Sequence, residues 1–124
     1  MNNSYLLTIP GTLPTLNQYI AAERSNRYKA AKMKRDAEER IAIAVRQCMR
    51  GVHIDNPVQL DYLWVTKDKR TDRDNIAFAK KFVQDALVQC GVLKDDGWKY
   101  VVGFSDRFEV DKDDPHIEVL IKEV

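Results

Sequence analysis

The most constraining feature of the sequence is an apolar stripe in its first half. Apolar residues recur at steps of three and four from Ala30 to Cys48, as they do on one face of an α-helix. Most basic residues of this stretch fall off the stripe, and Gly51 is a suitable end signal. The pattern predicts an amphipathic helix from about Asn26 to Gly51, which needs a second layer of structure to cover its apolar face.

Four short apolar runs have the composition of β-strands. They cover residues 5–9, 58–65, 98–108 and 116–121. The first run is stopped by Pro10-Gly11, and the last shows a clear alternation of apolar and polar positions. Residues 12–18 contain proline and polar side chains, and we expect them to form a loop.

A second helical stripe follows a highly charged segment. Eight of the ten residues in 66–75 are charged or Asn, and the helical period then returns from Ile76 to Cys90. This predicts a helix over about residues 75–89. The element order is therefore β-α-β-α-β-β, an α+β fold with two helices packed on one face of a small mixed sheet. No repeat or linker interrupts the chain, so residues 1–124 are expected to form a single domain.

Composition narrows the class of protein. Hydrophobic residues make up 44% of the chain and charged residues 31%, which is typical of globular rather than disordered proteins. No apolar run approaches the roughly 20 residues that cross a bilayer, and the first residues do not resemble a secretory signal. We expect a cytoplasmic protein with no membrane partner. Its two cysteines, Cys48 and Cys90, and its two tryptophans, Trp64 and Trp98, are expected in the core.

The formal net charge of +1 conceals opposed blocks of charge. Residues 24–50 contain nine basic and three acidic side chains, and residues 24–35 contain six basic side chains and no acid. Between residues 106 and 114, five acids face two bases. A basic segment of this kind is either a solvated helix face or a binding site for a polyanion such as DNA.

An acidic cluster is the feature most suggestive of chemistry. Asp72 and Asp74 project to the same side if the chain there is extended, and Asp95-Asp96 follows some twenty residues later. Carboxylate oxygens are the ligands that Mg²⁺ and Mn²⁺ prefer. The alternative is structural, with Asp74 as a helix cap and Asp95-Asp96 as a turn. Whether Asp95-Asp96 returns to the other acids depends on the path of the following strand.

Basic residues surround these acids. On a continuous helix from Asp74, Lys81 and Asp85 fall on the face of Asp74, whereas Lys80 lies well off it. The Lys81 ammonium could stabilise charge on a phosphate, or form an ordinary surface ion pair with Asp85. Acids that bind a metal, ringed by bases that bind phosphates, are what metal-assisted phosphodiester hydrolysis needs.

Three motifs resemble those of the RusA family of Holliday-junction resolvases. They are Asp72-Arg73-Asp74-Asn75, then Lys81 followed by Asp85-Ala86-Leu87, and then Asp95-Asp96 after Gly91 and an apolar pair. The segment Pro14-Thr15-Leu16-Asn17 also resembles that family's loop after the first strand. The resemblance covers nearly the whole chain in element order and length, and it points to the prophage type of the family.

The resemblance implies a homodimeric endodeoxyribonuclease that recognises four-way DNA junctions and cuts them with paired symmetric nicks in DNA recombination and repair. It implies Mg²⁺, with Mn²⁺ as a substitute, and no other small-molecule cofactor. The metal ligands would be Asp72, Asp74 and Asp96, and the catalytic lysine would be Lys81. In a known resolvase of the family the lysine follows the second acid by four residues, a place held here by Phe78, whereas Lys81 follows Asp74 by seven.

DNA contacts are expected from basic residues in two segments, and the first segment would hold the junction arms by counterion release. These residues are Arg24, Arg27, Lys29, Lys32, Lys69, Arg70 and Arg73. Two alternatives stay open. One is a non-catalytic nucleic-acid-binding accessory protein for recombination, in which the acids only cap and turn. The other is a metal-dependent nuclease with a looser preference, for flaps or RNA.

Overall fold

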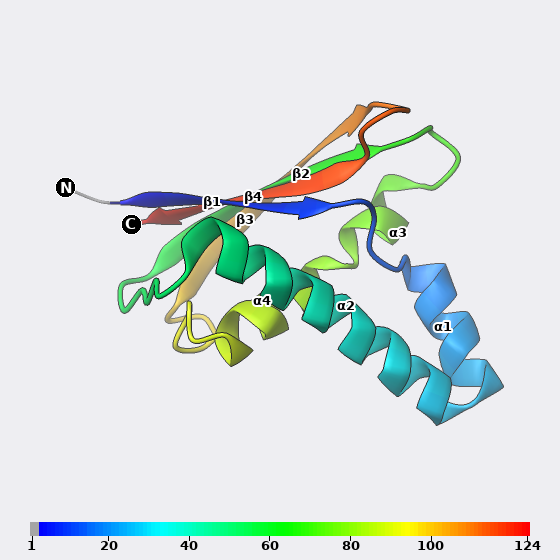
Figure 1. Ribbon diagram of the computed structural model, residues 1–124, viewed down its shortest axis with the longest axis horizontal. Helices are drawn as coiled ribbons and strands as arrows, with labels where there is room; N and C mark the ends of the chain where they lie inside the picture. The colour runs from blue at the N-terminus through cyan, green and yellow to red at the C-terminus, as the bar shows by residue number, and fades with distance from the viewer. Residues whose placement is uncertain (1–2) are drawn as a thin grey trace.

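A computed structural model describes residues 3–124, and in that part of the chain four helices lie on one face of a four-stranded mixed sheet (Figure 1). The elements in chain order are β1 (Ser4–Pro10), α1 (Leu16–Ser25), α2 (Arg27–Met49), β2 (Val58–Thr66), α3 (Arg73–Ala77), α4 (Lys80–Gln89), β3 (Val101–Val110) and β4 (His116–Glu123). The α+β class and the mixed sheet are as the sequence predicts.

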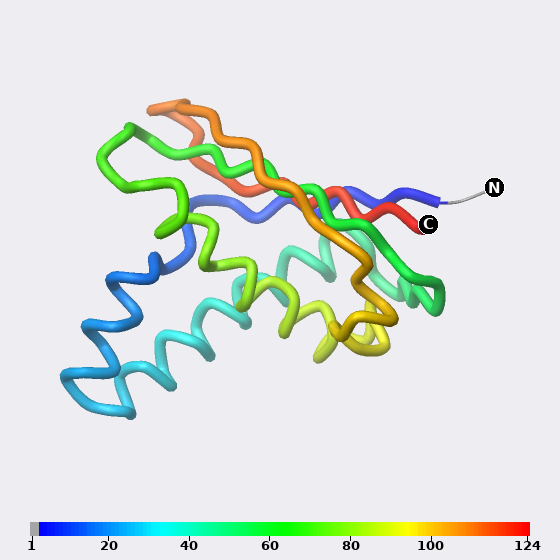
Figure 2. The backbone as a smooth tube through the Cα atoms, turned by 180° about the vertical axis from the view of Figure 1, so that it is seen from behind, coloured from blue at the N-terminus to red at the C-terminus, as the bar shows by residue number. Residues whose placement is uncertain are grey.

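The strand order across the sheet is β1-β4-β2-β3, so the last strand of the chain lies between the first two. β4 is antiparallel to both β1 and β2, with Leu7 opposite Val119 and Leu60 opposite Ile121. β3 is parallel to β2 and forms one edge of the sheet, while β1 forms the other. Figure 2 shows the same layering from behind.

The core lies between the sheet and helices α2 and α4. Ile41 of α2 and Leu87 of α4 are fully buried in one core cluster that also contains the helix-facing side chains of β2. Among these, Tyr62 and Trp64 alternate along the strand and stack with ring centroids 5.3 Å apart. The alternation and the helical stripes together account for a single apolar layer.

The predicted element order β-α-β-α-β-β is wrong in the number of helices, because it contains two and the structure has four. The segment expected to be a loop leads into α1, because Thr15 and Gln18 form a reciprocal capping box just after the proline. The helix predicted over 75–89 is broken into α3 and α4. At the break, the Ala79 and Lys81 amides donate to carbonyls three residues back, which tightens the turn.

Two of the residues expected in the core are at the surface. Trp98 is 98% exposed in the segment before β3, and Cys48 is exposed on α2. Trp64 is buried as predicted, and Cys90 is partly buried against the core. Of the helices within residues 3–124, none is both long enough and apolar enough to span a membrane.

Candidate active site

Asp72 and Asp74 of the acidic cluster lie where the segment after β2 leads into α3. Asp72 is the residue before α3, with extended backbone, and its side chain makes no capping hydrogen bond. Asp74 lies in the first turn of α3, and its Oδ1 accepts a hydrogen bond from the Asn75 amide at 3.0 Å. Both side chains are exposed, and neither has an ion-pair partner within residues 3–124. Their carboxylate oxygens are free to bind a cation.

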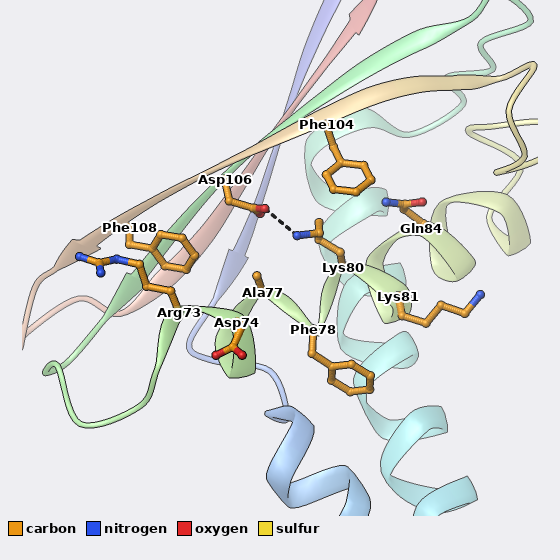
Figure 3. A pocket seen from close by; sticks show the side chains of 10 residues that line it. All are labelled: Arg73, Asp74, Ala77, Phe78, Lys80, Lys81, Gln84, Phe104, Asp106 and Phe108. Carbon is orange, nitrogen blue, oxygen red and sulfur yellow. Dashed lines mark hydrogen bonds and ion pairs between the residues drawn. The ribbon is translucent and has the colours of Figure 1, made fainter.

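An open groove of about 610 Å³ runs from Asp74 along α4 and under β3 (Figure 3). Its walls carry three cationic side chains on the helical side and an acid between two phenylalanines on the strand. The lining residues include Arg73, Asp74, Lys80, Lys81, Gln84, Phe104, Asp106 and Phe108. A carboxylate at one end and several cations along the wall are suited to a phosphate-bearing ligand.

Lys80 and Asp106 form the best-defined polar contact in this groove. The Lys80 Nζ lies 2.6 Å from the Asp106 Oδ2, and the other carboxylate oxygen accepts a hydrogen bond from the Trp64 indole at 2.8 Å. The ammonium also lies 4.8 Å from the ring centroid of Phe104. Sequence reasoning missed both Lys80 and Asp106. A signal was present, since Asp106 is a lone acid in an alternating run with Phe104 and Phe108.

Tyr62 forms part of the floor beneath this pair. Its hydroxyl accepts a hydrogen bond from the Gln84 side-chain amide at 3.2 Å. Burial of the phenol disfavours its charged form and raises the pKa of Tyr62 well above the usual range, although the Gln84 hydrogen bond opposes the shift. Tyr62 is therefore a neutral structural element here.

Lys81 lines the groove but does not point toward Asp74. Its Nζ lies 3.3 Å from Asp85, one turn further along α4, and Asp85 also contacts Lys34 of α2. Figure 3 shows Lys81 extending away from Asp74 while Lys80 reaches toward β3. The broken helix explains this placement, because the tightened turn at 78–79 changes the rotation between Asp74 and Lys81 that a continuous helix would give.

Asp96 lies away from the other two predicted metal ligands. The segment that carries it is held at the start of β2 and β3: Leu93 forms a bridge with Ile54, and the Val58 amide donates to the Tyr100 carbonyl. Asp72 follows the opposite end of β2. One chain therefore places Asp72 and Asp74 at the start of α3, in adjoining grooves that share Arg73, and Asp96 at the other end of β2.

Asp72 and Asp74 fit a hard divalent cation, because they offer exposed carboxylate oxygens that are not neutralised by a neighbouring base. Two carboxylates, completed by water and phosphate oxygens, are a common ligand set for Mg²⁺. Within residues 3–124, however, no three acidic, histidine or cysteine side chains gather closely enough to form a metal site.

The basic residues expected to contact DNA are exposed, and they fall in two places. Arg24, Arg27, Lys29 and Lys32 lie at the junction of α1 and α2, and Lys69, Arg70 and Arg73 lie between β2 and α3. Both places are at the same end of the molecule in Figures 1 and 2. Lys32 is paired with Asp36 at 2.7 Å, and the Arg73 guanidinium lies over the Phe108 ring at 5.8 Å.

The segment Pro14-Thr15-Leu16-Asn17 and the acidic motif meet directly. The Asn17 amide donates to the Asn75 side chain at 3.1 Å, so the residue after Asp74 anchors the start of α1. Tyr19 of α1 packs on Phe78 and Phe82, with ring centroids 5.6 and 5.7 Å away. These contacts fix α3, and therefore both acids, against α1.

Comparison with known proteins identifies one family. The family model described as endodeoxyribonuclease RusA matches residues 10–122, nearly the whole chain. No curated protein matches the sequence. The matched range includes both acids at α3, the groove along α4, strands β2 and β3 and all but the last residue of β4, and it includes only Pro10 of β1.

Proposed function

The chain belongs to the RusA family of endodeoxyribonucleases, and from this premise we propose that it is a metal-dependent nuclease that cuts four-way DNA junctions during recombination and repair. One observation carries the proposal: Asp74 presents an exposed carboxylate at the end of a groove whose wall carries Arg73, Lys80 and Lys81, and the exposed Asp72 lines an adjoining groove that shares Arg73 with it. All of residues 1–124 would form the one catalytic domain.

The acids would hold Mg²⁺, or Mn²⁺ in its place, through Asp72 and Asp74, with Asp96 as the third ligand that the family resemblance implies. A bound divalent ion supplies Lewis-acid stabilisation of phosphate charge and lowers the pKa of a bound water. The exposure of both side chains leaves room for the phosphate oxygens and waters that complete the shell of a hard cation.

A lysine would stabilise the charge that develops on the phosphate. Lys81 is the residue that the family motif indicates, and its side chain is 64% exposed and able to turn its ammonium into the groove by rotation. Lys80 is the second candidate, but it is held by Asp106 and neutralises that acid. Comparison of Lys81→Met with Lys80→Met in single-turnover cleavage separates the two, and we expect the larger loss of rate from Lys81→Met.

DNA would be held by the exposed basic residues at the α1–α2 junction and between β2 and α3. Each phosphate contact releases condensed counterions, so binding should weaken steeply with salt. Arg24 and Arg70 are suitable probes, because each is exposed and lies in a different segment. Replacing either with alanine should weaken junction binding and reduce the salt slope by about one unit.

The deciding experiment incubates the protein with a synthetic four-way junction, with and without Mg²⁺, alongside Asp74→Asn. We expect paired nicks only with wild type and Mg²⁺, and retained junction binding by Asp74→Asn, because the substitution removes a ligand charge at an exposed position. The matched control is Glu39→Gln, an exposed acid on α2 that lies outside the groove.

Three results would contradict the proposal in different ways. A junction that is bound but uncut under all conditions would indicate the non-catalytic accessory protein. Faster cleavage of flaps or RNA than of the junction would indicate a nuclease with a looser preference. Loss of both binding and cleavage in Asp74→Asn would mean that the acid is structural.

A further inference from the structure

We propose that the groove between α4 and β3 binds an unpaired stretch of a DNA strand beside the phosphate that is cut, with one base stacked on Phe104. The inference rests on the proposed function, because the same groove begins at Asp74. It adds the form of DNA that the site accepts, and it assigns to Phe104 a role in the choice of substrate.

Phe104 extends the apolar surface of the core into the groove. In the parallel register, Phe104 lies beside Leu60 of β2, and Phe108 lies beside Trp64. Side chains in register on neighbouring strands face the same side of a sheet, so both phenylalanines face the helix-covered side. Leu60 and Trp64 are at most 1% exposed, whereas Phe104 is 54% exposed. Much of the Phe104 ring is therefore open to a ligand in the groove.

Each phenylalanine of the groove has a cation over its ring. The Lys80 ammonium lies 4.8 Å from the centroid of the Phe104 ring, and the Arg73 guanidinium carbon lies 5.8 Å from that of Phe108. Lys80 is held in place by Asp106 at 2.6 Å and is only 17% exposed. Aromatic rings that stack on bases, beside cations that follow the phosphates, are the means by which proteins bind single-stranded nucleic acid.

The order of these side chains suits a strand that enters from the acidic end. Arg73, the neighbour of Asp74 in sequence, contacts Phe108, whereas Phe104 lies further along the groove, toward Gln84 (Figure 3). Four residue steps along β3 separate the two phenylalanines, about 13 Å at the usual rise of a strand. A strand with one phosphate at Asp74 would pass Arg73 first and then bring a neighbouring base to Phe104.

A double helix cannot use the Phe104 ring in this way. Bases in a duplex cover one another's faces at about 3.4 Å per step, so a side chain stacks on a base only after that base has left the stack. The groove, at about 610 Å³, has the size of a small-molecule site. A few unpaired nucleotides fit such a volume, and a four-way junction supplies them where its branch point opens.

The charge of the groove favours a nucleic acid over a peptide or an apolar molecule. Its cations are Arg73, Lys80 and Lys81, and its acids are Asp74 and Asp106. Lys80 neutralises Asp106, and the proposed metal would neutralise Asp74. Arg73 has no ion-pair partner within residues 3–124, so its charge is available to a phosphate.

The first test compares Phe104→Leu, which removes the ring but keeps an apolar side chain, with Phe104→Tyr, which keeps the ring. Binding of a labelled oligothymidine and of a duplex of the same length is measured by fluorescence anisotropy without divalent metal. We expect Phe104→Leu to weaken binding of the single strand roughly 5- to 100-fold and to leave binding of the duplex unchanged. Phe104→Tyr should bind both DNAs as the wild type does.

The controls separate loss of stacking from loss of fold. Leu6→Ala truncates a side chain that is 50% exposed on β1, the other edge strand, and it should bind both DNAs as the wild type does. Unchanged affinity of Phe104→Leu for the single strand would overturn the inference. So would equal losses for strand and duplex, or an equal loss in Phe104→Tyr.

The second test changes the DNA instead of the protein. One junction is fully paired, and the other carries T·T mismatches on each side of the branch point. Mismatches remove much of the energy needed to unpair and unstack a base, so the wild type should bind the mismatched junction about tenfold more tightly. Phe104→Leu should lose most of this preference. Equal binding of the two junctions by the wild type, or a preference that survives Phe104→Leu, would overturn the inference.

Failure of the proposed function gives a different result. Binding is measured without Mg²⁺, so the comparison of Phe104 variants does not depend on cleavage. A wild type that never cuts the junction in Mg²⁺ would refute the proposed function, while the binding data would still decide what the groove holds. Cleavage by a protein whose single-strand affinity ignores Phe104→Leu would refute this inference alone.

Discussion

Replacement of Asp106 with alanine should destabilise the fold, although Asp106 lies on an edge strand. Its carboxylate contacts the Lys80 ammonium at 2.6 Å and the Trp64 indole at 2.8 Å, and the side chains of Lys80 and Asp106 are only 17% and 22% exposed. Removing the acid leaves a largely buried charge and a buried N–H without a partner. If the pair were completely buried, Asp106→Ala would lower the free energy of unfolding by about 3–5 kcal/mol. Partial exposure reduces the expected decrease to about 2–3 kcal/mol.

The pair formed by Lys32 and Asp36 is an internal control for this magnitude. It has nearly the same length, 2.7 Å, but its side chains are 68% and 56% exposed. Asp36→Ala should therefore change the free energy of unfolding by only a few tenths of a kcal/mol. Burial, rather than distance, is the property that the comparison isolates.

Urea denaturation and thermal unfolding measure the difference. For a chain of this size, a loss of about 2–3 kcal/mol lowers the melting temperature by roughly 6–15 °C. Asp106→Asn retains an acceptor for Trp64, so its free energy of unfolding should fall less than that of Asp106→Ala. A double-mutant cycle of Asp106→Ala with Lys80→Met should give a coupling energy of about 1–3 kcal/mol. An Asp106→Ala effect no larger than that of Asp36→Ala, or an additive cycle, would refute the reasoning.

Three further substitutions test other parts of the fold. Hydrogen bonds to the Asp114 carbonyl and the Glu118 carboxylate raise the pKa of His116 above its ordinary 6.5, so the imidazolium stabilises the fold at lower pH and this contribution is lost as the pH rises through the raised pKa. His116→Gln should thus destabilise more at pH 5.5 than at pH 9 in urea titrations, and equal losses at both pH values would argue against the charged form. Thr15→Ala removes the capping box of α1 and should lower the free energy of unfolding by about 1 kcal/mol. A negligible change would show that the cap is dispensable. Gly91→Ala should lower the melting temperature more than Gly51→Ala does. Both glycines have φ near +78°, but only at Gly91 would a Cβ lie 3.1 Å from the His53 ring. Equal melting temperatures for the two variants would contradict this contact.

Local pattern was sufficient to predict much of the fold. The stripe that ends near Cys48 predicts α2, and the apolar runs around Ile9, Trp64 and Val119 predict three strands close to their observed bounds. The order of strands in the sheet carries no local signal, because the pairing of β4 between β1 and β2 depends on contacts more than fifty residues apart.

Local pattern also predicted part of the candidate site. Asp72 and Asp74 both lie at the start of α3 because they are close neighbours in sequence. The position of Lys81 was not predictable from helical geometry, because the tightened turn after α3 interrupts the helix that the calculation assumes. The position of Asp96 depends on the parallel direction of β3, and Asp106 enters the groove only through that strand.

The insertion of β4 at the centre of the sheet has a consequence for the order in which the chain can fold. Residues far apart in sequence pair with each other, Ser4 with Lys122 and Pro10 with His116, and within residues 3–124 β1 has no other strand neighbour. During synthesis, β2 and β3 can associate as a parallel pair before β4 emerges, while β1 waits without a sheet partner. β4, His116–Glu123, joins the two parts, so the sheet can close only after this strand has left the ribosome.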